Sequence, residues 1–123
     1  MLEADYPFNI KVDKSMKKFD IKSIGYDNFD GQLKHNVSAH PKVDRQTGEL
    51  MAFGYGVEGK GVIHHSVFNK DRKCTSSVTI PISNPRMIHD FMITENYSIM
   101  PDLPMELRPD LCFKNKFIFH YDD

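Results

Sequence analysis

Residues 47–55 read TGELMAFGY, and this stretch decides the class of fold. Met51, Phe53 and Tyr55 fall on one side of an extended chain, while the small residues between them fall on the other. A side lined by small residues allows another backbone to approach closely. Gly48 can adopt a positive φ at little cost, which predicts a turn before the run. The alternation therefore predicts a β-strand with one open side.

Further apolar runs with a period of two follow one another along the chain, separated by Gly, Pro, Asp and Asn. We predict strands at residues 8–12, 19–24, 61–68, 75–82, 87–94, 97–100 and 117–121. Residues 95–96 are expected to form a turn between the runs at 87–94 and 97–100. We therefore expect these two runs to pair. No stretch predicts a helix of more than one or two turns. The class is all-β, built from antiparallel meanders.

The composition fits a soluble globular chain. Its 123 residues are 40% hydrophobic and 27% charged, which argues against disorder. The formal net charge is −1, so no nucleic-acid partner is expected. No apolar run approaches the roughly 18 residues of a membrane-spanning helix. Cys74 and Cys112 form no C-x-x-C pair, so we expect two reduced thiols rather than a disulfide scaffold or a cysteine zinc site.

His89 lies within the run MIHDFMI, where it shares one face with Met87, Phe91 and Ile93. An imidazole on an apolar face needs a partner for each ring nitrogen, or it carries a desolvation cost. Backbone groups can supply these partners, which makes His89 an ordinary core residue. A metal on one nitrogen and a carboxylate on the other can also supply them. The pattern by itself favours the core residue.

His40 ends an extended run and is restricted by the proline that follows it. A side chain on a restricted backbone is well placed to bind a metal. The alternative is an ordinary loop histidine, which the pattern by itself favours. His40 and His89 are far apart in the sequence, so they meet only if the ends of their two runs converge.

The other histidines carry weaker signals. His64 and His65 are adjacent, so they point to opposite faces of a strand, and we expect solvent exposure rather than metal binding. His35 and His120 show no specific pattern. Glu3 stands in an acidic start of the chain, which by composition is simply solvated.

Several segments together resemble the carotenoid cleavage dioxygenases. They are YDNFDGQL (residues 26–33), SAHPKVD (38–44), TGELMAFGY (47–55), MIHDFMITENY (87–97), PDLP (101–104) and the opening EADYPF (3–8). The resemblance spans nearly the whole chain and keeps the order of the motifs. It implies about two blades of a seven-bladed β-propeller, with residues 1–123 forming part of that domain. Residues 58–73 match the family poorly.

The resemblance also implies a metal site. Family members bind Fe(II) through four histidines, and the A-H-P-K and M-I-H-D-F motifs place two of them at His40 and His89. The family also has three glutamates that hydrogen-bond the ligands, and one of these falls on Glu3, with His89 as its expected partner. The implied reaction cleaves a carbon–carbon double bond of a carotenoid or apocarotenoid with O₂ and gives two carbonyl products. An apolar tunnel suits such a substrate.

The chain lacks the other two histidines and two glutamates of the family site. We therefore expect a piece of a dioxygenase that is inactive alone, because an iron site with half of its ligands binds weakly. The alternative is a non-catalytic β module that binds an apolar ligand or a protein partner through its open edges. We expect an intracellular protein, in the plastid or the cytoplasm if the source is plant-like.

The segment from Leu103 to Phe113 allows one further alternative. Its apolar residues, Leu107 and Leu111 among them, can contact a lipid surface, because family members often take substrate from membranes. A loop packed on its own blade is the favoured interpretation, since scattered exposed apolar residues are normal.

Overall fold

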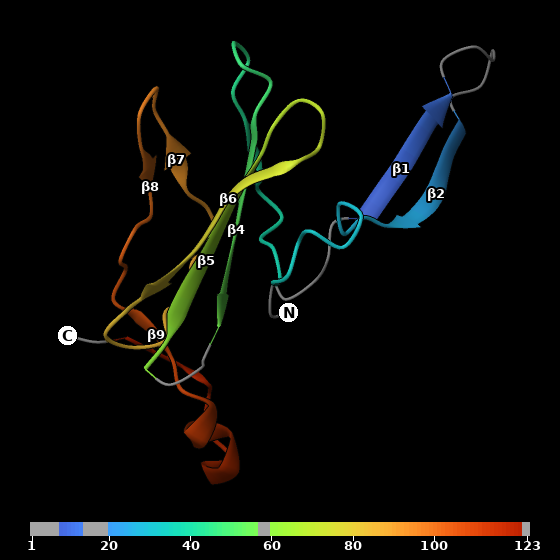
Figure 1. Cartoon of the computed structure of the whole chain (residues 1–123). Coiled ribbons are helices and arrows are strands. Elements are labelled where there is room, and N and C mark those ends of the chain that lie inside the picture. Colours follow the sequence, from blue (N-terminus) through green and yellow to red (C-terminus); the bar gives the residue numbers. More distant parts are fainter. Residues whose placement is uncertain (1–7, 14–19, 57–59, 122–123) are drawn as a thin grey trace.

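The computed structural model describes residues 8–13, 20–56 and 60–121 (Figure 1). The elements are β1 (Phe8–Asp13), β2 (Asp20–Tyr26), β3 (Lys42–Val43), β4 (Leu50–Gly56), β5 (Val62–Phe68), β6 (Cys74–Pro81), β7 (Met92–Ile93), β8 (Ser98–Ile99), β9 (Met105–Leu107), the 3₁₀-helix η1 (Pro109–Lys114) and β10 (Phe119–Tyr121). Every strand pair between these elements is antiparallel. The prediction of an antiparallel all-β class is confirmed.

A four-stranded sheet forms the centre of the structure. Its strands follow the chain in the order β3-β4-β5-β6, which is the meander that the short turns predict. A four-stranded antiparallel meander is the unit of a propeller blade. The hairpin β1–β2 lies apart from this sheet (Figure 1), and β7–β8 and β9–β10 form two further two-stranded ribbons.

Each face of the sheet carries its own apolar core. One core joins Ala52 and Phe68 to Phe29, Leu33 and Val37, so the loop after β2 covers this face. The other core joins the apolar side chains of β4 and β5 to the segment before β7. Its buried members are Phe53, Tyr55, Ile63, Ile88 and Phe91. The alternation of residues 47–55 therefore supplies both cores from a single strand.

The open side of β4 is used as its small residues predict. Asn36 crosses the strand there, and its side-chain amide donates to the carbonyl of Tyr55 at 2.8 Å. A Cβ placed on Gly54 would overlap the carbonyl oxygen of Asn36. Only glycine allows the two backbones to lie this close.

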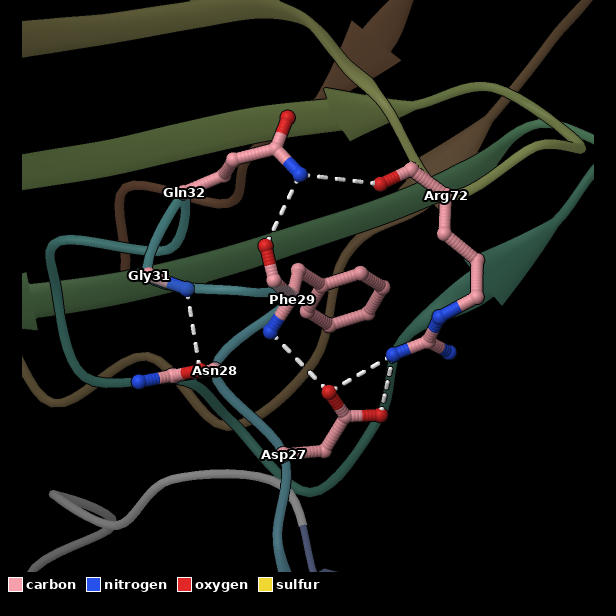
Figure 2. A network of polar contacts seen from close by, with 6 residues as sticks. All are labelled: Asp27, Asn28, Phe29, Gly31, Gln32 and Arg72. Carbon is pink, nitrogen blue, oxygen red and sulfur yellow. Dashed lines mark hydrogen bonds and ion pairs between the residues drawn. The ribbon is translucent and has the colours of Figure 1, made fainter.

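A polar clamp fixes the loop after β2 to the turn between β5 and β6 (Figure 2). The guanidinium of Arg72 pairs with both oxygens of Asp27, at 2.5 and 2.6 Å, and lies 4.5 Å from the ring centre of Phe29. The side chain of Gln32 donates to the carbonyls of Phe29 and Arg72 and accepts the backbone N–H of Cys74. Phe29 in turn stacks on Phe68 in the core.

The predicted strand at residues 87–94 is wrong for most of its length, because only Met92–Ile93 forms a strand. The expected pairing with residues 97–100 is confirmed, since β7 pairs with β8. The carboxylate of Asp90 accepts the N–H of Phe91 at 2.8 Å, and the hydroxyl of Ser38 donates to the carbonyl of His89. These side-chain bonds replace the ladder bonds of a strand.

The segment from Leu103 to Phe113 contains β9 and most of η1. Leu107 is buried and therefore packs in the protein, while Leu111 is half-buried and Phe113 is 92% exposed. In the part of the chain that the structure describes, no helix has the length and apolar character needed to cross a membrane. Cys74 and Cys112 are both free thiols, as predicted.

Candidate metal centre

The structure brings His40 and His89 together across 49 residues of sequence. Their Nε2 atoms lie 2.9 Å apart, and the rings meet edge to face with centres 4.5 Å apart. His40 lies two residues before β3, and His89 lies three residues before β7. The two runs that carry the predicted ligands therefore do converge.

The orientation predicted for His89 is wrong. We expected its ring to point inward on an apolar strand face, but the residue is exposed and lies outside the strands. Its neighbours Ile88 and Phe91 are buried instead, at 1% and 2% exposure. Because these two side chains anchor the segment on the sheet, the backbone between them turns the imidazole away from the core and toward His40.

The separation of the two nitrogens fits a shared metal ion. Metal–imidazole bonds are about 2.0–2.1 Å long, so two ligands at right angles have nitrogens about 2.9 Å apart. Neutral imidazoles are good ligands for divalent first-row metals, iron included. Within residues 8–13, 20–56 and 60–121, no three metal-binding side chains gather at one place. The described residues thus supply a pair of donors that fits part of an iron site.

Two polar contacts hold the segments of the histidines together. The hydroxyl of Ser38 lies between their backbones. On the outside, the Lys42 ammonium and the Asp90 carboxylate form an ion pair at 2.7 Å. The hydrogen bond from Lys42, with help from the N–H of Phe91, lowers the pKa of Asp90 below its ordinary value. This exposed ion pair is the outer of the two contacts between the motifs.

A second group of histidines lies at the middle of β5. It consists of His64 and His65, which belong to this strand, and His35, which contacts it. His64 and His65 point to opposite faces, as predicted, and His64 contacts the Thr79 hydroxyl at 3.1 Å. The expected exposure is wrong for both: His64 is half-buried, and His65 is buried on the face that carries Phe91, with ring centres 6.0 Å apart. Burial lowers the pKa of His65, and this favours the neutral ring.

His35 is a buried residue that the sequence pattern missed. Its Nδ1 lies 2.6 Å from the carbonyl of Asn36 and its Nε2 lies 2.7 Å from the hydroxyl of Ser66. Ser66 contacts Ser77 in turn, at 3.0 Å. Burial lowers the pKa of His35, although the Asn36 carbonyl opposes this shift. Because Ser66 is 31 residues away, no local signal could have revealed the contact.

Two further residues were considered in the sequence, His120 and Glu3. His120 lies in β10, where it is exposed and pairs in register with Glu106. Glu3, the predicted carboxylate partner of His89, lies outside the described residues. Its role stays a prediction.

The antiparallel sheet and its flanking ribbons place the chain in the propeller class of all-β folds. A solved structure supports this class: lignostilbene dioxygenase of Pseudomonas brassicacearum matches with a TM-score of 0.77 and 27% identity, over 98% of this chain and 25% of its own. The sequence model of the RPE65 family, described as retinal pigment epithelial membrane protein, matches residues 1–123.

Curated relatives agree with this match. Carotenoid 9,10(9',10')-cleavage dioxygenase 1 of Pisum sativum is 46% identical over 121 residues, and the Arabidopsis thaliana protein of the same name is 41% identical. Both alignments cover 98% of this chain and 22% of the relative. A 9-cis-epoxycarotenoid dioxygenase of Arabidopsis, labelled chloroplastic, is 42% identical over 85% of this chain and 18% of its own length. The chain therefore belongs to the carotenoid oxygenase family, and it spans about a fifth of the length of these relatives.

Proposed function

We propose that the complete protein is a non-haem Fe(II) dioxygenase that cleaves a carbon–carbon double bond of a carotenoid or apocarotenoid. O₂ is the second substrate, and the products are two carbonyl compounds. One observation carries the proposal: the histidines of the two family motifs place their Nε2 atoms 2.9 Å apart. The names of the relatives, which are carotenoid dioxygenases, supply the reaction class.

In this proposal His40 and His89 hold the iron through Nε2, and Glu3 fixes the His89 ring by a hydrogen bond. The bound iron supplies the activation of O₂. The residues of this chain position the two iron ligands. Pro41 restricts the backbone of His40, and the burial of Phe91 beside His89 fixes the second ligand on the sheet. The rest of the complete protein provides the remaining ligands and the substrate tunnel, so this chain alone is inactive.

The test uses the complete protein and its His40→Ala and His89→Ala variants. The parent is expected to hold about one iron per chain and to convert a carotenoid to two carbonyl products that carry label from ¹⁸O₂. Both variants lose the iron and the activity, because each removes a donor from the pair. His64→Ala is the matched control, since this histidine contacts Thr79 on the sheet and is expected to leave iron content unchanged.

Two results would contradict the proposal. The first is a parent protein without iron, and retention of an apolar ligand in that case supports the non-catalytic β module. The second is full iron content in either alanine variant.

A further inference from the structure

Ser38 is a buried residue, 5% exposed, that stands two positions before His40. Its backbone N–H donates to the carbonyl of Phe53 at 2.7 Å. Phe53 is itself 1% exposed and lies in the middle of β4. Ser38 is therefore fixed to a largely buried strand, four residues before the chain enters β3 of the same sheet.

The hydroxyl of Ser38 contacts the backbones of both candidate ligands. It donates to the carbonyl of His89 at 2.8 Å and accepts the N–H of His40 at 3.3 Å. A serine hydroxyl has one donor and two acceptor sites, so both bonds form at once. A single oxygen atom thus joins two segments that are 49 residues apart in the sequence.

His89 depends on such a contact because it lies outside the strands, where no ladder sets the position of its carbonyl. Another link between the two motifs is the ion pair of Lys42 and Asp90. Its side chains are 30% and 48% exposed, and exposed ion pairs contribute little. The Ser38 hydroxyl is the stronger of these two links, since Ser38 is 5% exposed and its part-buried bonds are screened less by water than the ion pair is.

We propose that Ser38 is a positioning residue that sets the separation and the mutual angle of the His40 and His89 rings before a metal binds. The proposal rests on the proposed function, because it takes these two histidines as ligands. Contacts that orient ligands typically change metal affinity about 10- to 100-fold when they are removed. Ser38 differs from the usual case in that it acts on the ligand backbones rather than on the second ring nitrogen.

The experiment compares Ser38→Ala, Ser38→Thr and Ser66→Ala in the complete protein. Fe(II) is titrated without oxygen, Co(II) is titrated in parallel for its visible absorption, and the melting temperature is measured without metal. Ser38→Ala is expected to bind both metals about tenfold more weakly, with changed Co(II) bands. Ser38→Thr keeps the hydroxyl and restores both. Ser66→Ala removes a buried hydroxyl that contacts His35 and Ser77, so it lowers the melting temperature without changing metal affinity.

The outcomes separate this proposal from the function on which it rests. If the parent binds the metals and Ser38→Ala binds them equally well with the same Co(II) spectrum, Ser38 is only structural and the proposal is wrong. If Ser38→Ala and Ser66→Ala weaken metal binding equally, loss of stability explains the effect and the proposal is again wrong. A parent that binds neither metal contradicts the proposed function itself, and with it the role of Ser38.

Discussion

Two groups of histidines lie close to the four-stranded sheet, and they differ in what their ring nitrogens contact. His40 and His89 direct nitrogens at each other, 2.9 Å apart. His35 instead has a protein oxygen within 2.7 Å of each nitrogen, and both of its partners belong to the fold. Imidazoles lie close together in the second group as well, because His35 stacks on His64 with ring centres 5.3 Å apart.

The comparison shows that proximity of histidines does not define a metal site. In His35 the Asn36 carbonyl only accepts, so Nδ1 carries the proton, and the lone pair of Nε2 accepts the hydroxyl of Ser66 and is not left for a metal. Two nitrogens that face each other are different, because a metal ion between them satisfies both at once. The first group is therefore the candidate centre, and the second stabilises the sheet.

The largest expected effect comes from replacing one histidine of each group by alanine and comparing the two variants. In the complete protein, His40→Ala is expected to weaken Fe(II) binding at least about 100-fold, while the melting temperature of the metal-free protein stays nearly unchanged. His35→Ala is expected to do the reverse: it keeps iron and loses about 1–3 kcal/mol of unfolding free energy, because Ser66 loses a buried partner. Iron analysis and thermal denaturation measure the two effects. Loss of iron in His35→Ala would contradict the division into a metal-binding group and a stabilising group.

Phe91 connects the two groups, because its ring contacts both Phe53 and His65 and because it is the last residue of the M-I-H-D-F motif that carries His89. Phe91→Ala is expected to cost about 3–5 kcal/mol of unfolding free energy, measured by chemical denaturation. Phe91→Leu keeps most of the apolar volume and serves as the control, with a smaller loss. A loss below about 1 kcal/mol for the alanine variant would show that the core tolerates a void here.

The buried group also predicts a pH dependence of stability. Burial lowers the pKa of His35 and His65 below the ordinary 6.5, so near and below pH 6.5 the unfolded chain binds protons that the folded chain does not. The unfolding free energy is therefore full above pH 6.5 and falls as the pH drops below it. Denaturation of metal-free protein between pH 7.5 and 5.5 measures the slope. His35→Gln is expected to reduce that slope, and an unchanged slope would contradict this assignment.

The smallest effect is expected from the exposed ion pair of the first group. Lys42→Met removes the partner of Asp90, and the affinity for Fe(II) is expected to change less than about threefold because solvent screens the pair. A salt titration of the parent protein is the companion measurement and should leave affinity equally unchanged. A tenfold loss of Fe(II) affinity in Lys42→Met would show that this ion pair, and not Ser38, is the main link between the histidines.

The regular part of the fold was predictable from local pattern. The alternation in residues 47–55 and 61–68 identifies β4 and β5, because each strand must supply side chains to two cores. The same alternation at residues 87–94 misled the prediction. Apolar side chains there pack on the face of a sheet that belongs to other segments, and a period of two does not distinguish this from a ladder.

The candidate site was predictable only through the resemblance of its motifs. Nothing local in the sequence says that His40 meets His89, since the contact spans 49 residues. Ser38 stands beside a ligand motif, but its partner at residue 89 becomes evident only when the two segments meet. The buried pair of His35 and Ser66 was missed for the same reason.

The close approach of the Asn36 backbone to Gly54 has a consequence for mutations in the gene. Every single-nucleotide missense change in a glycine codon adds a side chain, and at this position any side chain displaces the backbone of Asn36. That displacement reaches Ser38 within two residues and His40 within four. We therefore expect missense alleles of this codon to lose function, although the residue they alter has no chemistry of its own.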